Sequence, residues 1–290
     1  MWCADNWQDY TLIDTSDGER LESWGKYRVI RPDPQVIWKN EKKSAEWKNA
    51  DAIYSRRGGG GSWAVNLLPE KWNIEYKNLG LKFQIKAMGF KHMGLFPEQA
   101  ANWDWFSSLI KEAGRPIKVL NLFAYTGGAT VAAAKAGASV THVDASKGMV
   151  SYAKENAALN GLSEHPIRYI VDDCRKFCER EQRRGNLYDA VIMDPPSYGR
   201  GPGGQVWKLE ECIYDLVKLA ANLLSDKPLF FLLNSYTTGL SASAMGYILG
   251  SCISKKCAGR VVCDELGLRV KETNMPLPCG SASRWTCNER

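Results

Sequence analysis

Short apolar runs alternate with amphipathic stretches over the second two thirds of the chain. The runs are five or six residues long and cover residues 118–123, 139–143, 167–171, 188–193 and 229–233. Between them, apolar positions repeat at helical spacing, which predicts helices over residues 98–113, 126–136, 147–160, 175–183 and 206–224. Strands and helices that alternate at this pitch form a parallel sheet with right-handed crossovers.

The first third and the tail of the chain instead alternate single apolar and polar residues. Residues 27–31, 36–38 and 81–86 are typical of short antiparallel strands, and residues 260–270 and 281–287 of a final antiparallel pair. The basic, glycine-rich segment 55–62 is expected to be a flexible loop. We therefore expect an α/β protein with a small β-rich N-terminal domain, residues 1–92, and a doubly wound, mostly parallel, seven-stranded sheet in residues 93–290.

The composition is that of an ordinary globular protein, with 44% hydrophobic and 24% charged residues among 290. No apolar run approaches the roughly 18 residues that a membrane span needs, and the N-terminus lacks a basic and then apolar signal segment. The nine cysteines are scattered and never spaced as C-x-x-C, which argues against a disulfide framework and against a metal site. We expect a cytoplasmic protein that engages neither membrane nor metal.

The net charge of +6 is unevenly distributed. The segment from Arg20 to Lys91 holds 15 Lys and Arg residues against 7 Asp and Glu residues, whereas the rest of the chain holds 23 against 25. The positive excess therefore lies in the N-terminal third, which favours a polyanion as partner.

Glycines or carboxylates stand where each of the first four predicted parallel strands ends. Gly127-Gly128 follow the first strand, Asp144 ends the second, Asp172-Asp173 end the third, and Asp194 follows the fourth. Each feature alone is also typical of a turn or a helix N-cap. Because the carboxyl ends of parallel strands meet at one rim, the four together predict a nucleoside site there.

Two common nucleotide motifs are absent from that rim. A dinucleotide fold would place Gly-x-Gly-x-x-Gly after the first strand, and Tyr125 occupies the first glycine position. A phosphate-binding P-loop would end in Gly-Lys-Ser/Thr, which the sequence lacks. These departures argue against NAD and against ATP as the ligand.

Three segments, residues 121–128, 141–146 and 193–198, resemble the class I S-adenosylmethionine-dependent methyltransferases, which have a Rossmann-like fold. More narrowly, they resemble the bacterial group that modifies 23S ribosomal RNA and includes cytosine-5 and guanine-N7 enzymes. Residues 94–99 resemble the signature of that group before its first helix. The resemblance covers residues 85–240 closely and the tail loosely, and it implies S-adenosyl-L-methionine as the cofactor.

By this resemblance, Gly127 lies against the methionine part of the cofactor, Asp144 binds the ribose, Asp173 binds the adenine, and Asp194 lies beside the transferred methyl group. The residues implied to bind the cofactor are Phe96, Phe123, Tyr125, Thr126, Gly127, Asp144, Ala145, Ser146, Asp173, Cys174 and Asp194.

The segment Asp194-Pro195-Pro196-Ser197-Tyr198 is the predicted catalytic centre. Asp194 and the Pro195 carbonyl can accept hydrogens from a base amine, and Tyr198 can stack on the base, although Ser197 stands between the prolines and this aromatic. Cytosine-5 enzymes of the group carry a cysteine after the fifth strand, and residues 233–238 contain none. We therefore expect methylation of a base nitrogen.

RNA, and ribosomal RNA in particular, is the expected substrate. Arg200 in the glycine-rich loop 198–204, and Arg56 with Arg57, are the predicted phosphate contacts, although a plain surface loop is an equal alternative for Arg200. The cations near Trp38 and Trp47 suit single-stranded RNA, or the tryptophans form a core. The sequence leaves open a small-molecule or protein methyltransferase, a cofactor-dependent RNA-binding protein without catalysis, and any oligomeric state.

Overall fold

A computed structural model describes residues 1–57, 60–200, 206–253 and 257–287. The chain divides into two compact units. The first comprises Met1–Ala101 and Leu266–Cys279, and the second Asn102–Glu265 and Gly280–Arg290. The expected boundary between an N-terminal domain, residues 1–92, and a methyltransferase domain, residues 93–290, stays a prediction.

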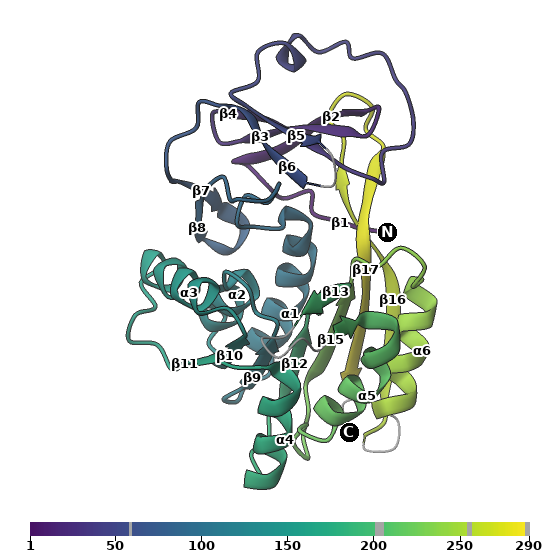
Figure 1. Ribbon diagram of the computed structural model, residues 1–290. Coiled ribbons are helices and arrows are strands. Elements are labelled where there is room, and N and C mark those ends of the chain that lie inside the picture. The colour runs from purple at the N-terminus through teal and green to yellow at the C-terminus, as the bar shows by residue number, and fades with distance from the viewer. Residues whose placement is uncertain (58–59, 201–205, 254–256, 288–290) are drawn as a thin grey trace. The chain divides into compact units, whose positions relative to one another are not determined.

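An eight-stranded, mostly parallel sheet confirms the expected α/β architecture (Figure 1), and its central strands lie in the second unit. The sheet has the order β1-β16-β17-β15-β12-β9-β10-β11. Seven of these are β9 (Lys118–Leu122), β10 (Ser139–Asp144), β11 (Ile167–Val171), β12 (Ala190–Met193), β15 (Phe230–Ser235), β16 (Gly259–Arg269) and β17 (Pro276–Cys287). The expected count of seven is one short, because the two-residue strand β1 (Trp2–Cys3) pairs with β16 at Leu266 and Gly267.

The strand order reverses between β9 and β12. Strand β9 pairs in parallel with both β10 and β12, and the sheet continues to β11 beyond β10 and to β15 beyond β12. Leu122 and Met193, the last residues of β9 and β12, are in register. The loops that follow these two residues therefore lie at the switch point, where open α/β sheets bind ligands.

Helices pack on both faces of this sheet, so its strands read as continuous apolar runs. The helices are α1 (Ala100–Glu112), α2 (Gly128–Lys135), α3 (Lys147–Leu159), α4 (Cys174–Arg184), α5 (Leu209–Ala221) and α6 (Ala242–Ile253). Successive side chains of β15 point to opposite faces: Phe231 belongs to the core with α4, α5 and α6, while Phe230 stacks on Phe106 of α1. No described helix is both long and apolar enough to cross a membrane.

The predicted start of the helix at residue 206 is wrong. Val206–Lys208 forms strand β14, which pairs antiparallel with β13 (Tyr198–Arg200), and α5 begins only at Leu209. The strand is defined by its pairing with β13, and the helical periodicity of the segment does not show that pairing. Helix α6 was also not among the predicted helices.

The first unit is β-rich, as expected. Its five-stranded sheet consists of β2 (Tyr10–Ser16), β3 (Glu19–Trp24), β4 (Tyr27–Pro32), β5 (Ala52–Arg57) and β6 (Gly60–Asn66), and β7 (Trp72–Tyr76) pairs with β8 (Leu81–Ile85). The strand expected at residues 36–38 is absent from this described segment. The buried side chain of Trp47 donates to Asp14 at 2.8 Å, so this tryptophan is part of the core.

The flexible loop predicted at residues 55–62 is not found where this segment is described, because these residues belong to two paired strands. Strands β5 and β6 pair antiparallel on both sides of residues 58–59, with Arg57 opposite Gly60. A Cβ atom at Gly61 would lie 2.4 Å from the ring of Tyr54. Gly61 therefore lets the paired strand β6 pass over an aromatic ring, while residues 58–59 of the expected loop lie outside the described residues.

Candidate active site

The loop after β9 has an unusual backbone. Phe123, Tyr125 and Gly127 all have left-handed φ angles, of 56°, 51° and 85°. Such angles are uncommon for residues other than glycine, and they cluster at functional sites because surrounding contacts must hold them. Two amides supply such contacts: Ala124 donates to the Val143 carbonyl at 3.0 Å, and Tyr125 donates to Asp144 at 2.8 Å.

Close packing against α3 explains why residue 127 is a glycine. It precedes α2, and a Cβ atom at this position would lie 2.8 Å from the Cβ atom of Ala153 on α3. The nearby carbonyl of Thr126 accepts a 2.8 Å hydrogen bond from the buried side chain of Asn156, also on α3. Helix α3 thus packs against the loop so closely that only glycine can be accommodated at residue 127.

Asp144 ends β10 beside this loop. Its Oδ2 accepts from the Tyr125 amide and its Oδ1 from the Ser146 amide, both at 2.8 Å. Burial raises the pKa of Asp144, and these two amides partly oppose that shift. Each oxygen keeps a further lone pair, so the carboxylate is held in place and can still accept hydroxyl groups. Ala145 and Ser146 are exposed, and the Ser146 side chain caps α3.

The polar side chains at the end of β11 already have partners within the protein. Asp173 is exposed and caps α4, its Oδ1 accepting from the Lys176 amide at 2.9 Å. Asp172 forms an ion pair with Arg180. The Cys174 thiol is buried, accepts a 3.3 Å hydrogen bond from the Phe123 amide and lies in the core. Burial raises the pKa of this thiol well above its usual value, so the sulfur is neutral and unreactive.

The Asp194–Ser197 loop is held by three neighbouring segments. The indole of Trp207 on β14 donates to the Pro196 carbonyl at 2.6 Å. The Leu209 amide, at the start of α5, donates to the Ser197 carbonyl at 3.1 Å, and the Thr237 hydroxyl donates to the Ser197 hydroxyl at 2.7 Å. A rigid loop of this kind suits a catalytic carboxylate and carbonyl that must be placed accurately.

Trp207 also links the two loops at the switch point. Its ring centroid lies 5.7 Å from that of Phe123, whose loop follows β9. The sequence analysis missed Trp207 and Thr237, because both reach the catalytic loop from segments more than ten residues away. Asn156 was missed for the same reason, since it contacts Thr126 from 30 residues further along the chain.

Ser197 and Tyr198 differ in their surroundings. Ser197 directly follows the two prolines and is turned toward Thr237. Tyr198 is 53% exposed and opens β13. Arg200 ends β13, and its side chain lies outside the described residues, as do residues 201–204 of the glycine-rich loop.

The remaining predicted site residues belong to the first unit. The ring of Phe96 is half-buried and lies 5.4 Å from the ring of His92. Arg56 is exposed on β5, and the side chain of Arg57 lies outside the described residues. In the part of the chain that the structure describes, no group of three or more His, Cys, Asp or Glu side chains gathers as metal ligands would.

The rim therefore offers a loop of left-handed residues, a fixed half-buried carboxylate at Asp144, and a clamped Asp-Pro-Pro segment. A sequence-family model for S-adenosylmethionine-dependent methyltransferases matches residues 54–224, which is more than half of the chain. The chain belongs to this family. Its cofactor is accordingly S-adenosylmethionine, and the fixed Asp144 carboxylate fits a ligand that carries ribose hydroxyls.

Solved structures support this assignment. The chain is 39% identical to a methyltransferase from Agrobacterium tumefaciens, with a TM-score of 0.90 over 98% of this chain and 92% of that one. A Streptococcus mutans methyltransferase, 18% identical with a TM-score of 0.73, covers 97% of this chain and 76% of its own length and shares the fold.

Curated relatives of this methyltransferase match over part of their length. The ribosomal RNA large subunit methyltransferase K/L of Shewanella baltica is 34% identical over 147 residues, 50% of this chain and 19% of that protein. The corresponding protein of Shewanella pealeana is 32% identical over 169 residues, 58% of this chain and 22% of that protein. The chain thus spans about a fifth of the length of the curated relatives that it matches.

Proposed function

We propose that this methyltransferase transfers a methyl group from S-adenosylmethionine to a base nitrogen of RNA, with ribosomal RNA as the substrate. The observation that carries the proposal is the clamped Asp194–Ser197 loop at the switch point, on the rim that also carries the fixed carboxylate of Asp144. The cytoplasmic location expected from the sequence remains part of this prediction.

Asp144 and the loop after β9 are the proposed cofactor site. The carboxylate of Asp144 accepts the ribose hydroxyls, and the backbone of Tyr125, Thr126 and Gly127 passes beside the methionine part. Asp173 remains the candidate for the adenine amine, since its carboxylate is exposed. Cys174 contributes through its backbone, because its thiol is already engaged in the core.

Asp194 and the Pro195 carbonyl are the proposed acceptors for the hydrogens of the attacking amine. The bound cofactor supplies an electrophilic methyl group, so the protein has mainly to orient the nucleophile and exclude water. Two acceptors fixed on one rigid segment hold the amine hydrogens in a plane and direct the nitrogen lone pair toward the methyl group. Trp207 and Thr237 keep that segment in position.

Tyr198 is the proposed stacking residue for the base, supported by its 53% exposure directly after the catalytic loop. RNA as substrate is supported by the excess positive charge between Arg20 and Lys91 and by the names of the Shewanella relatives. Arg56, Arg57 and Arg200 are retained as proposed phosphate contacts.

Mass spectrometry of RNA nucleosides tests the proposal directly. Purified protein is incubated with labelled S-adenosylmethionine and either ribosomal RNA, a protein extract or a small-molecule pool. Label in a base-nitrogen-methylated nucleoside supports the proposal, whereas label confined to protein or small molecules contradicts RNA as the substrate.

Two variants separate binding from turnover. Asp144→Ala should lose cofactor affinity, because the fixed acceptor for the ribose is gone. Asp194→Ala should bind cofactor normally and lose turnover. Calorimetry with the cofactor product and single-turnover assays measure both quantities, and an equal loss of affinity in the two variants would contradict the assigned roles.

A further inference from the structure

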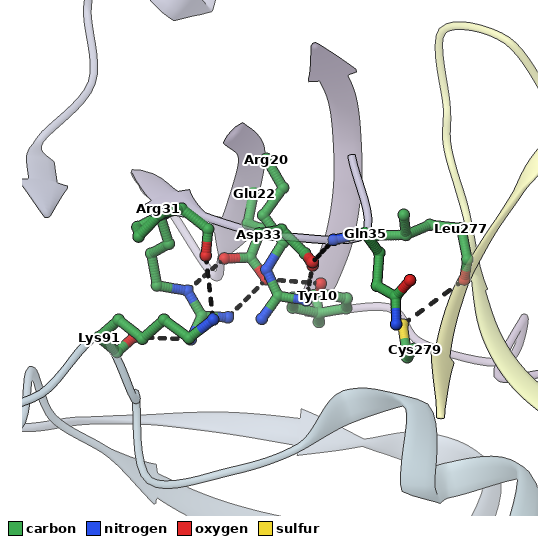
Figure 2. Close-up of polar contacts among 10 residues, drawn as sticks. Tyr10, Arg20, Glu22, Arg31, Asp33, Gln35, Lys91, Leu277 and Cys279 are labelled. Carbon is green, nitrogen blue, oxygen red and sulfur yellow. Dashed lines mark hydrogen bonds and ion pairs between the residues drawn. The ribbon is translucent and has the colours of Figure 1, made fainter. Parts of the chain in front are cut away.

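A cluster of charged side chains in the first unit consists of residues that have no role assigned so far. Three cations, Arg20 on β3, Arg31 on β4 and Lys91 after β8, surround two carboxylates, Glu22 on β3 and Asp33 after β4 (Figure 2). Figure 2 shows the side chains of the three cations converging on one region. The cluster therefore carries one more positive than negative charge.

Arg31 and Glu22 form the structural part of this cluster. Arg31 donates to Glu22 through Nε at 2.6 Å and Nη2 at 2.7 Å, and its Nη1 donates to the Lys91 carbonyl at 2.8 Å. Burial would raise the pKa of Glu22, but the charges of Arg20 and Arg31 lower it to about 2. All three nitrogens of the Arg31 guanidinium thus donate within the protein, and one of them fixes the backbone at Lys91.

The guanidinium of Arg20, in contrast, makes no hydrogen bond with the described residues. Its Nε lies 3.5 Å from Glu22 and its Nη1 lies 3.5 Å from Asp33, which are ion-pair distances only. The Nε atom is buried without a hydrogen-bond partner among the described residues. A guanidinium has five N–H donors, and buried donors are normally satisfied. The guanidinium of Arg20 is therefore incompletely satisfied by the described residues, and its side chain is 11% exposed.

Lys91 is the uncompensated cation. Its ammonium group donates to the Pro32 carbonyl at 3.1 Å, and no other hydrogen bond from it occurs in the described ranges. Burial lowers the pKa of Lys91 to about 8, and the charges of Arg20, Arg31 and Arg56 contribute while Asp33 opposes them. An anion placed beside Lys91 would offset the repulsion from these arginines.

An exposed aromatic residue stands next to this cation. Residues 88–92 form a tight turn, in which the Met88 amide donates to the His92 carbonyl at 3.1 Å. The turn is anchored to β6, because the indole of Trp63 donates to the Met88 carbonyl at 2.8 Å. Phe90 is 76% exposed on this turn. An exposed aromatic residue adjacent in sequence to a cation suits single-stranded RNA, which needs a ring for a base and a cation for a phosphate.

We propose that Lys91 and Arg20 bind a backbone phosphate of single-stranded RNA, with Phe90 stacking on an adjacent base. The proposal rests on the proposed function, in that the RNA is the methylation substrate. It adds a defined phosphate site to the charge excess of the N-terminal segment, at residues other than the arginines considered above.

The test compares the salt dependence of RNA binding among single variants. Fluorescence anisotropy with a labelled single-stranded RNA should show roughly tenfold weaker binding for Lys91→Gln at low salt. The slope of log affinity against log salt should fall by about 0.7 in this variant, the value expected when one phosphate is no longer neutralised. Lys82→Gln removes an exposed lysine of the neighbouring strand β8 and should change affinity less than about twofold.

Phe90→Ala should also weaken binding roughly tenfold, but with the salt slope of the wild type, because stacking releases no counterions. Lys91→Gln and Phe90→Ala alter half-buried and exposed residues, so thermal melts should match the wild type. Arg20→Gln serves as a further variant only if its melt is also unchanged.

A pH series adds a second readout. The groups that face Lys91 are Arg20, Arg31, Arg56 and Asp33, and the neighbouring His92 has a pKa lowered to about 4 by burial and these cations. RNA affinity should therefore fall as the pH rises through 8, when free Lys91 loses its proton. Lys91→Arg stays charged and should flatten this dependence.

The outcomes separate the two proposals. Wild-type protein that binds and methylates RNA while Lys91→Gln retains the wild-type salt slope overturns this site and leaves the proposed function intact. Wild-type protein that fails to bind RNA overturns RNA as the substrate, and this site with it.

Discussion

The indole nitrogen of Trp207 donates to the carbonyl oxygen of Pro196 at 2.6 Å. This single bond connects the hairpin of β13 and β14 to the loop that carries Asp194, and the Trp207 ring lies near Phe123 at the end of β9. The residue that rigidifies the proposed catalytic segment is thus one whose importance appears only in the folded chain.

Replacing Trp207 with phenylalanine should slow turnover without releasing the cofactor. Trp207→Phe keeps a ring near Phe123 and loses the donor to Pro196, worth about 1 kcal/mol, so the single-turnover rate should fall roughly fivefold to tenfold. Cofactor affinity by calorimetry should stay within about twofold. Tyr214→Phe, at a half-exposed position on α5, is the matched control and should leave both quantities unchanged. A wild-type rate in Trp207→Phe would refute the clamping role.

Gly127→Ala should destabilise the protein by two separable effects. The left-handed φ of 85° costs an alanine about 1 kcal/mol, and the contact with Ala153 adds about 1–3 kcal/mol of overpacking. Gly137→Ala is the control for strain alone, since Gly137 also has a positive φ, of 107°, but open space around its Cβ position. Urea unfolding should show the larger loss at Gly127, partly restored by adding Ala153→Gly. Equal losses at the two glycines would argue against the steric effect.

His142 should make the protein less stable in mild acid. This buried ring hydrogen-bonds to Thr130 at 2.9 Å, and burial lowers its pKa to about 3. The unfolded chain takes up the proton near pH 6.5 and the folded chain only near 3, so unfolding gains protons between these values. The free energy of unfolding should consequently fall with decreasing pH below 6.5, by about 2 kcal/mol at pH 5.

Urea unfolding between pH 8 and pH 5 measures this dependence, and His142→Gln should show a shallower decline than the wild type. His92, whose pKa is lowered to about 4, accounts for a second part of the slope, which His92→Gln should remove. Parallel curves for wild type and His142→Gln would contradict the assignment.

Replacing Glu22 should lower the free energy of unfolding more than replacing Glu19 on the same strand. Glu22→Gln leaves the buried guanidinium groups of Arg31 and Arg20 without their shared counter-charge, which should cost about 3 kcal/mol. Glu19→Gln, also on β3, breaks a partly exposed ion pair with Lys42 and should cost less than about 1 kcal/mol. Chemical denaturation of the two variants measures both values, and similar losses would mean that the buried pair is not a stability determinant.

The sequence by itself determined the sheet and its rim. Apolar runs buried on both faces mark parallel strands directly, so the residues that end them, such as Asp144 and Asp194, could be placed from the chain alone. The bounds of the expected helices agree with α1 to α4 within about two residues, because their periodicity and caps are local signals.

Only the tertiary structure decided which groups support the rim. The indole bond from Trp207, the packing of Ala153 against Gly127 and the contact of Asn156 with Thr126 all join segments that are distant in sequence. The strand at Val206–Lys208 and the hairpin of β5 and β6 depend on pairing with a strand close by in the sequence, whereas local patterns there indicated a helix and a loop. Burial and hydrogen bonding of a side chain depend on what the fold brings beside it, and a single sequence states only the local part of that information.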